Sequence, residues 1–486
     1  MVKYKDLREW IEQARQMNEL AVVEGADTKY ELGAVGQLSA KNRGPAVLHQ
    51  KIKGYRPNFR VMTNMLSNPR TISLTFGMPT ENTVKETVET MRTDITRWKR
   101  EAENFPPTVV AKGPIMENLV EGEAIDLKTF PVPLWHEEDG GPYIGTADAW
   151  ITRDPDTGQV NCGTYRAQLH DGKTVGMMIT HGHHGRLHRQ KYFDRGQPCP
   201  AVLVVGMDPL LFATAASPIS IDTGELNYMG AIRGESVPVI LGKVTGLPIP
   251  ANAEIAIEGF VDPTAKIQEG KFGEWQGYYA GDVTGQPFLK ATTLYYRNDP
   301  ILTGAPPAKP PYGDADLWKS VIYSSLLYND LLHVPGIKGV WRPTVGGAYY
   351  LQVISIKQQY GGHAAHVGHA AASVTSGAFS GRYTIIVDDD VDPYDLEDVM
   401  WAVCTRSLPT DTDIIKKPRG SHSDPMFHRT PETAHLDSTN PRAIIYAVKP
   451  YEWRQDFAAV NIASEDLRKE VFAKWKDNFN GRLKTI

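Results

Sequence analysis

Apolar residues recur with helical spacing at the beginning of the chain. One face of this predicted amphipathic helix carries Leu7, Trp10, Ile11, Ala14 and Met17. The segment GPAVLHQKI that follows is typical of a strand, and the charged run ENTVKETVETMRTDITRWKRE predicts a second helix. The turn-forming EAENFPPT comes next. We therefore expect a small α/β domain over residues 1–115.

The pattern changes near residue 126, where short β-branched runs separated by Gly, Pro and Asp replace the helical spacing. The six runs are DAWITRD, TVGMMIT, PAVLVVGM, VPVILGKVTG, AEIAIEGFV and FLKATTLYYR. Because no long helix separates them, they predict an antiparallel barrel or split β-barrel over residues 116–310. The proline-rich GAPPAKPPYGD, Gly304–Asp314, would form the boundary of this domain.

Helices and strands alternate over the rest of the chain. Helices are predicted at DLWKSVIYSSLLYN, HAAHVGHAAASV and YDLEDVMWAVCTR, and strands at YYLQVISI, RYTIIVD and AIIYAV. This alternation predicts a third, α/β domain over residues 311–486. The last helix, SEDLRKEVFAKWKDNF, is amphipathic and would pack on this domain or on a partner chain. The predicted fold class is thus α/β plus β, with a central split β-barrel between two α/β domains.

Length and charge narrow the classes of function. A chain of 486 residues exceeds one typical core, which agrees with two or three domains. The net charge of -5 and the pI near 6.3 provide no basic surface for a phosphate backbone, so nucleic acid is not an expected partner. The beginning of the chain lacks the apolar run of a signal peptide, and no stretch has the ~18 apolar residues of a membrane span. We therefore expect a cytoplasmic protein without a membrane partner.

Two segments have the composition of metal sites. DDDVD, Asp388–Asp392, begins like an EF-hand loop, but Pro393 and Val399 stand where that loop requires Gly and Glu. An acidic loop that caps the next helix explains it better. HGHHGRLH, residues 181–188, could bind a metal, although no HExxH spacing supports it. A His-rich helix face explains the spacing of His363, His366 and His369.

The segment EGKFGEWQGYY contains two acids, Glu269 and Glu274, that are five residues apart. A regular helix or strand would direct them to different faces. They converge only if the segment loops, and Gly270 and Gly273 permit a loop or a close approach of a ligand to the backbone. The alternative is a solvated loop with two exposed acids that have no role.

The segment NCGTYRAQ places an amide, a phenol and a guanidinium on one predicted strand. Asn161 and Arg166 are five residues apart, so a regular strand would point them to opposite faces. An arginine on the inner wall of a barrel requires an anion, which could be a carboxylate side chain, a substrate carboxylate or a phosphate. The sequence contains no Walker A, GxGxxG, GxSxG or kinase signature. Residue patterns alone therefore indicate one candidate site, in which Glu269 and Glu274 are the acids and Arg166 binds an anion.

Several blocks resemble the UbiD family of decarboxylases, in the order of that family from about residue 161 to 406. They are NCGTYRAQ, GELNYMGAIRGE, AEIAIEGFV with EGKFGEWQGYY, IKQQYGGHAAHVGHA, and DDDVDPYDLEDVMWAVCTR. The resemblance implies reversible, non-oxidative decarboxylation of an aromatic, heteroaromatic or α,β-unsaturated acid, with release of CO2. It implies prenylated FMN as cofactor, supplied by a flavin prenyltransferase and held with manganese or magnesium and with potassium. It also implies a homo-oligomer, a dimer or a hexamer.

The resemblance assigns roles to residues of this chain. Glu274 would protonate the substrate carbon, while Glu269 pairs with Arg166. The implied cofactor-binding residues are Asn161, Thr164, Arg166, His184 and Glu225, and the implied manganese ligands are Asn161, His184 and Glu225. His184 is chosen by its spacing from Asn161, with His181 and His183 as alternatives. Ala216 and Ser217 are candidates for the potassium site, where a tight turn before Pro218 is the alternative.

This chain also departs from the family pattern. Many relatives have GHAKxV where this chain has GHAAHV, so Ala365 replaces a lysine, and Lys271 replaces a proline of the family. If that lysine holds the phosphate, its substitutes here would be Arg233, Lys243 or His366. RGSHSDPMFHR, Arg419–Arg429, is a candidate specificity loop. Two other classes of function remain open for this protein. One is a non-catalytic assembly or cofactor-carrying subunit, and the other is a metal-dependent hydrolase that uses the His-rich segment, residues 181–188.

Overall fold

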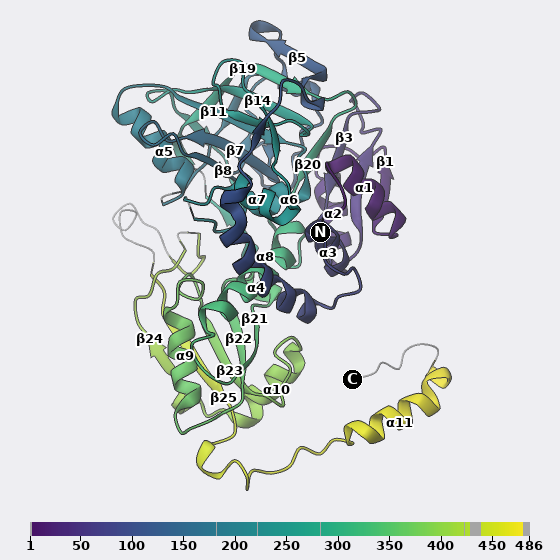
Figure 1. Cartoon of the computed structure of the whole chain (residues 1–486), viewed down its shortest axis with the longest axis vertical. Helices are drawn as coiled ribbons and strands as arrows, with labels where there is room; N and C mark the ends of the chain where they lie inside the picture. Colours follow the sequence, from purple (N-terminus) through teal and green to yellow (C-terminus); the bar gives the residue numbers. More distant parts are fainter. Residues whose placement is uncertain are drawn as a thin grey trace.

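The computed structural model of the chain describes residues 2–180, 182–220, 222–281, 283–421, 423–427 and 439–479. His181 lies outside the described residues, as do part of the candidate specificity loop and the end of the chain. Figure 1 shows three sheet-based regions, with helices α4 and α8 between the central and the C-terminal region. Within the described residues, no helix combines the length and the apolar content that crossing a bilayer requires.

The N-terminal region is built on a four-stranded sheet of order β1-β2-β3-β20. Its strands are β1 (Leu20–Glu24), β2 (Ala46–Gln50), β3 (Arg60–Thr63) and β20 (Ile301–Gly304). The helices are α1 (Leu7–Gln16), α2 (Glu31–Lys41), α3 (Pro69–Phe76) and α4 (Val84–Glu101). The two predicted helices and the predicted strand are confirmed as α1, α4 and β2. The edge strand β20 comes from far along the sequence and pairs in parallel with β3, a contact that periodicity could not reveal.

The central region is an antiparallel sheet of order β10-β19-β14-β11-β7-β8, with β5 added on β19. Its strands are β5 (Asn118–Glu121), β7 (Asp148–Arg153), β8 (Val160–Gly163), β10 (Thr174–Gly176), β11 (Cys199–Val205), β14 (Ile255–Val261) and β19 (Phe288–Tyr296). Within the described residues the end strands β10 and β8 do not pair with each other, so the sheet is open and no closed barrel forms. A split β-barrel stays a prediction.

One of the six predicted runs lies elsewhere. The run VPVILGKVTG supplies β12 (Pro238–Leu241), which pairs with β13 (Pro248–Pro250) and β4 (Thr108–Val109) in a separate sheet. Three helices that the sequence did not predict interrupt the strands of the central region: α5 (His184–Asp194), α6 (Pro209–Ala215) and α7 (Glu225–Arg233). Helix α5 is polar over most of its length, and α6 and α7 are short, so none has a long apolar stripe.

The C-terminal region has a five-stranded sheet of order β21-β22-β23-β25-β24. Its strands are β21 (Ile337–Trp341), β22 (Leu351–Ile356), β23 (Tyr383–Asp388), β24 (Asp413–Ile415) and β25 (Arg442–Ala447). Helices α9 (His363–Ser373) and α10 (Leu396–Arg406) cover its two faces (Figure 1). Neighbouring residues of β22, such as Val353 and Ile354, belong to different apolar cores, because successive side chains of a strand point to opposite faces. The alternating helices and strands predicted here are confirmed.

Helix α8 (Asp314–Asp330) joins the C-terminal region to the rest of the molecule. It packs along α4, where the Asn329 side chain donates to the Arg92 carbonyl at 2.7 Å. At its beginning the Trp318 ring stacks on Phe76, with ring centroids 4.7 Å apart. The aromatic contact and the amide hydrogen bond together fix α8 on helices α3 and α4 of the N-terminal region.

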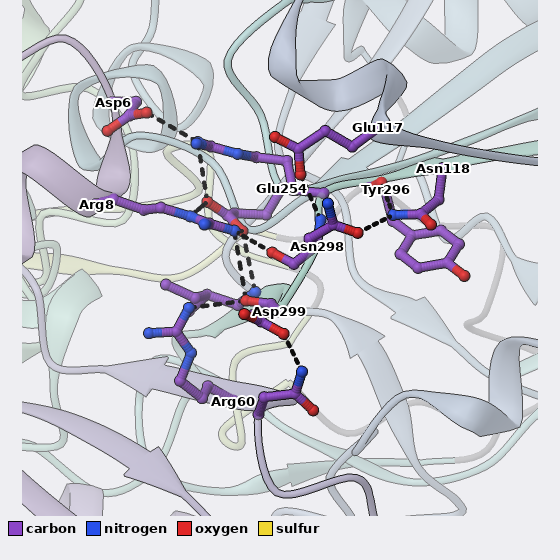
Figure 2. Close-up of polar contacts among 12 residues, drawn as sticks. Asp6, Arg8, Arg60, Glu117, Asn118, Glu254, Tyr296, Asn298 and Asp299 are labelled. Atoms are coloured by element: carbon purple, nitrogen blue, oxygen red, sulfur yellow. Dashed lines mark hydrogen bonds and ion pairs between the residues drawn. The ribbon is translucent and has the colours of Figure 1, made fainter.

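A buried carboxylate connects helix α1 to the central sheet (Figure 2). Glu254 is fully buried and accepts two hydrogen bonds from Arg8, both at 2.8 Å. Arg297 donates to Glu254 at 3.3 Å and to Asp6 at 2.8 Å. A paired guanidinium on each side compensates the charge of Glu254, which would be costly to bury alone.

The last helix, α11 (Glu465–Trp475), has no buried residue and lies apart from the sheets in Figure 1. Its exposed apolar side chains include Leu467, Val471 and Trp475. Of the two expectations for this helix, packing on its own domain is therefore wrong. Packing on a partner chain stays a prediction.

Candidate active site

Arg166 holds the two acids of the EGKFGEWQGYY segment together. Its Nε and Nη2 atoms donate to the two carboxylate oxygens of Glu269 at 2.8 and 3.0 Å, in a bidentate pair. Its Nη1 atom donates to Glu274 at 2.9 Å. Glu269 is buried, whereas the side chain of Glu274 keeps 18% of its surface exposed. One guanidinium thus joins a buried carboxylate to one that solvent or a ligand can reach.

The segment reaches this geometry by looping. Strand β15 (Ile267–Glu269) ends at the first acid, and β16 (Phe272–Gly273) ends just before the second. A Cβ atom on Gly270 would lie 2.4 Å from the Gly140 Cα, and one on Gly273 would lie 2.4 Å from the Pro307 carbonyl oxygen. Both glycines therefore allow close approaches to other parts of the protein backbone that no larger residue could make, and the predicted loop is confirmed.

Burial sets the proton affinity of the site. It raises the pKa of the Glu274 carboxyl above the ordinary value, and the nearby charge of Arg166 only partly opposes this effect. Burial by itself would lower the pKa of the Arg166 guanidinium, but hydrogen bonds and charge from Glu269 raise it above its usual range. The Tyr143 hydroxyl donates to Glu269 at 3.2 Å. The site therefore combines a permanent cation with an acid that keeps its proton to a higher pH than usual.

Arg166 does not lie on the same strand as Asn161, contrary to the prediction. Strand β8 ends at Gly163, and Arg166 lies in the connection that leads to β9 (Ala167–Gln168). The indole nitrogen of Trp150 donates to the Tyr165 carbonyl at 2.7 Å and holds this connection. The alternation of a regular strand therefore does not decide where Arg166 points.

A second group of polar residues forms around Asn161, on the other side of this connection. The Glu225 carboxylate, at the beginning of α7, accepts from the Cys162 backbone at 2.8 Å. The first turn of α5 also lies here, since a Cβ on Gly185 would be 3.4 Å from the Asn161 amide nitrogen. His184 immediately precedes Gly185. The structure therefore brings the three predicted metal-ligand positions into one neighbourhood.

These residues have the chemistry of cation ligands. The Asn161 amide nitrogen is buried and has no hydrogen-bond partner among the described residues. Burial raises the pKa of Glu225 to about 7, and burial lowers the pKa of His184, so it favours the neutral imidazole. Within the described parts of the chain, no group of three or more His, Cys, Asp or Glu side chains is arranged to hold a metal. An Asn, a His and a Glu are a different set, in which the amide oxygen is the third donor.

Thr164 and the predicted potassium position also lie nearby. The Thr164 hydroxyl donates to the Asp148 carbonyl at 2.8 Å, and the Thr164 backbone donates to the Ala215 carbonyl at 3.1 Å. Ala216 and Ser217 follow directly at the end of α6, where the Ser217 hydroxyl donates to the Ala213 carbonyl at 2.7 Å. The segment is thus a tight turn beside Thr164. This geometry agrees with a turn that has no ligand and also with a potassium site formed by Ala216 and Ser217.

None of the three predicted substitutes for the missing lysine is free. Arg233 forms an ion pair with Asp208, and Lys243 pairs with Glu121 at 2.8 Å. His366 contacts the Tyr360 hydroxyl at 2.8 Å.

The candidate specificity loop lies near the site. Burial lowers the pKa of His183, and the charge of Arg419, an arginine of this loop, lowers it further. The described part of this loop also contacts the acid segment, because the Gln276 side chain donates to the Ser423 carbonyl.

Sequence reasoning missed two ionisable groups near this site. Asp148, the first residue of β7, is fully buried, and burial raises its pKa well above the ordinary value. A single acid in the apolar run DAWIT is the signal that could have indicated it. Lys319, on α8, carries a charge that acts on Glu274. Its position in a helical pattern gave no sign of this contact.

Comparison with known proteins places this geometry in a family. Three models named for 3-octaprenyl-4-hydroxybenzoate carboxy-lyase match the chain: the N-terminal domain at residues 11–91, the Rift-related domain at 108–310 and the C-terminal domain at 318–445. A phenolic acid decarboxylase of Sedimentibacter hydroxybenzoicus is 30% identical, over 90% of this chain and 92% of that protein. The chain belongs to the UbiD family.

Other members agree over nearly the whole length. A pyrrole-2-carboxylic acid decarboxylase of Pseudomonas aeruginosa is 27% identical, over 97% of this chain and 98% of that protein. The structure of the UbiD-class enzyme HmfF of Pelotomaculum thermopropionicum, in complex with FMN, superimposes with a TM-score of 0.82. It is 25% identical and covers 95% of this chain and 98% of its own. The expected UbiD membership is therefore confirmed.

Proposed function

We propose that this UbiD protein is a carboxy-lyase that removes CO2, reversibly and without oxidation, from an aromatic or heteroaromatic acid. The observation that carries the proposal is the Arg166 guanidinium bound to both Glu269 and Glu274, with the pKa of Glu274 raised by burial. Such an acid keeps the proton that it can donate to carbon to a higher pH than an ordinary glutamate does. The decarboxylase names of the relatives support the substrate class.

The residues around Asn161 fit a metal-held flavin. Asn161, His184 and Glu225 would hold manganese or magnesium, because they offer an amide oxygen, an imidazole nitrogen and a carboxylate oxygen in one neighbourhood. Thr164 and Arg166 would contact the cofactor from the connection between the two groups. Ala216 and Ser217 would provide carbonyl and hydroxyl oxygens to potassium. When bound, prenylated FMN would supply an electron sink for the charge left by the departing CO2.

Glu274 would then complete the reaction. The bond between the ring carbon and the carboxylate breaks, and its electron pair stays on the carbon side. The protonated carboxyl of Glu274 donates its proton to that carbon, and a new C–H bond replaces the lost carboxylate. In the reverse direction the Glu274 carboxylate accepts the proton. Arg166 holds both acids in place throughout, since its Nε and Nη2 atoms bind Glu269 and its Nη1 atom binds Glu274.

The finer architecture belongs to the same proposal. We infer that residues 116–310 form the split β-barrel that holds the cofactor, that a flavin prenyltransferase supplies it, and that the protein assembles with itself. The exposed apolar side chains of α11 support an assembly of two or more chains.

The test is to produce the protein together with a flavin prenyltransferase, manganese and potassium. We expect a prenylated flavin at about one per chain by visible absorption and intact mass, and CO2 release from members of a panel of aromatic acids. A protein that binds the flavin but releases no CO2 would favour the non-catalytic subunit. A protein that contains no flavin but catalyses hydrolysis when a metal is added would favour the alternative of a metal-dependent hydrolase.

Asn161→Ala tests the proposed cofactor site separately from catalysis. It removes a buried metal donor, so we expect the purified protein to retain little flavin and little manganese. Absorption spectroscopy and metal analysis measure both. Gln197→Ala, at an exposed position beyond the end of α5, should retain both. Full flavin and metal in Asn161→Ala would remove Asn161 from the site.

A further inference from the structure

A cluster of aromatic rings beside Glu274 contains one amino group. We call it the aromatic cluster, and it comprises Lys319, Tyr323, Trp275, Tyr349 and Tyr350. The Trp275 ring, next to Glu274 in the chain, lies 4.6 Å from the Tyr349 ring and 4.8 Å from the Tyr350 ring, between centroids. Trp275 and Tyr350 are only partly buried. Flat apolar surface is therefore accessible directly beside the acid that we assign as proton donor.

Lys319 contributes the amino group from helix α8. Its Nζ atom lies 5.9 Å from the centroid of the Tyr349 ring, a cation–π distance. The Tyr349 hydroxyl in turn lies 3.3 Å from that of Tyr323, one turn further along α8. The lysine is thus held at the rim of the cluster, partly buried and partly exposed.

Within the described part of the chain Lys319 has no polar partner, whereas the three arginines around it each bind carboxylates or carbonyls. Arg166 is bound to two carboxylates, Arg382 forms an ion pair with Asp424, and Arg342 donates to the carbonyls of Ser376 and Tyr349. Lys319 makes no hydrogen bond or ion pair with any residue of the described chain. Burial lowers its pKa, whereas the charges of Tyr323 and Glu274 raise it. An anion close to Lys319 could therefore form a charge-assisted hydrogen bond with its ammonium group, which no described residue binds.

The reacting carboxylate is not the best partner for this lysine. That group loses its charge when CO2 leaves, so an ion pair to it would stabilise the bound acid more than the transition state. An anionic substituent that stays on the ring keeps its charge throughout the reaction. Binding it would position the ring on the aromatic cluster without slowing decarboxylation.

We propose that Lys319 is a specificity-determining residue that binds a second, non-reacting anionic group of the aromatic acid. The inference rests on the proposed decarboxylase function and narrows its substrate class to aromatic acids with two anionic groups. The aromatic cluster receives the ring, Glu274 faces the carbon that loses CO2, and Lys319 neutralises the remaining charge.

The test compares benzoate with the three benzenedicarboxylates, in which the second carboxylate is ortho, meta or para. Each is titrated by calorimetry into protein loaded with unprenylated FMN, which lacks the proposed electron sink, so that affinity is measured without turnover. We expect at least one dicarboxylate to bind about 10-fold more tightly than benzoate, the gain of one charge-assisted hydrogen bond. Lys319→Met should lose this preference and keep the benzoate affinity, and Lys319→Arg should keep part of the preference.

The control is Lys338→Met, because Lys338 is an exposed lysine of β21. It should bind every ligand as the unchanged protein does. A dicarboxylate preference that survives in Lys319→Met overturns the inference, as does an unchanged protein that binds no dicarboxylate more tightly than benzoate. Failure of the proposed function is seen separately, as absence of flavin from the protein or of CO2 release with every acid.

Discussion

At the scale of single residues, the proposed chemistry rests on Arg166 and Glu274. The guanidinium binds Glu269 with two nitrogens and Glu274 with the third, so the acids are held by one rigid, planar group. Lysine could not replace it, since an ammonium is a point charge without this fork. The raised pKa of Glu274 then follows from burial, and two predictions test it.

Glu274→Gln should reduce kcat by at least about 100-fold, the usual contribution of a positioned general acid. The amide keeps the shape of the side chain, so flavin content should not change. Turnover and visible absorption measure the two effects. Glu138→Gln is the matched control, because Glu138 pairs with Lys271 of the same segment but is exposed. Unchanged turnover in Glu274→Gln would exclude Glu274 as the proton donor.

The pH dependence of decarboxylation should follow the protonated form of Glu274. Because burial raises its pKa, the acid keeps its proton above the pH at which an ordinary glutamate loses it. The rate should therefore stay high as the pH rises through the ordinary range and fall only when it passes the raised pKa. A profile of kcat against pH checks this. A fall centred at the ordinary glutamate value would contradict it.

At the scale of elements, backbone contacts place the acid segment. Gly140 and Gly270 lie against each other, and a Cβ on Gly140 would come 2.2 Å from the Gly270 Cα. The Gly140 backbone also donates to the Lys271 carbonyl at 2.8 Å. The loop between β15 and β16 can therefore bring Glu269 and Glu274 to one guanidinium only if both positions lack a side chain.

Gly140→Ala should push this loop away from its neighbour. We expect a loss of about 1–3 kcal/mol in the free energy of unfolding, as for other overpacked sites, and a lower kcat because Glu274 moves. Chemical denaturation and turnover measure both. Gly281→Ala adds the same methyl group where nothing lies within 4 Å, so it should leave both quantities nearly unchanged. Equal effects of the two substitutions would show that the close approach is not required.

At the scale of the whole molecule, distant segments meet around buried polar groups. Glu254 joins Arg8 of the first helix (Figure 2) to Arg297, the residue that follows strand β19. Strand β20 completes the N-terminal sheet, and α8 packs on α4. The N-terminal and central regions therefore share sheets and ion pairs and should unfold together.

Glu254→Gln tests this coupling. It removes the negative charge that two guanidinium groups share, so we expect the free energy of unfolding to fall by about 3 kcal/mol. Chemical denaturation followed by fluorescence measures it. Glu235→Gln, at an exposed position, should cost little. If Glu254→Gln lowered the free energy of unfolding as little as Glu235→Gln does, the ion pairs of Glu254 would not couple the N-terminal and central regions.

How much could be predicted differs between elements for physical reasons. Helices α1 and α4 were predicted because their apolar residues repeat with a clear helical period, and strands β22, β23 and β25 were predicted as apolar, β-branched runs. Helices α5, α6 and α7 were missed, since a helix without a long apolar stripe has no such signal. Strand β20 was not predicted, because its pairing partner β3 lies more than two hundred residues earlier in the chain.

From the sequence, apolar periodicity predicted helices α1, α4, α8, α9 and α10 and part of the strands. The resemblance of several sequence blocks indicated the family and, through it, Arg166, Glu269 and Glu274 as the candidate trio. These blocks and local patterns are present in the chain whatever its tertiary fold. Only the tertiary structure decided that Arg166 leaves its strand, that both acids converge on it, and that Lys319 lies near Glu274 with no ion pair to any described residue. Burial, ion pairing and the raised pKa of Glu274 depend on distances between segments far apart in the chain, and packing alone determines those distances.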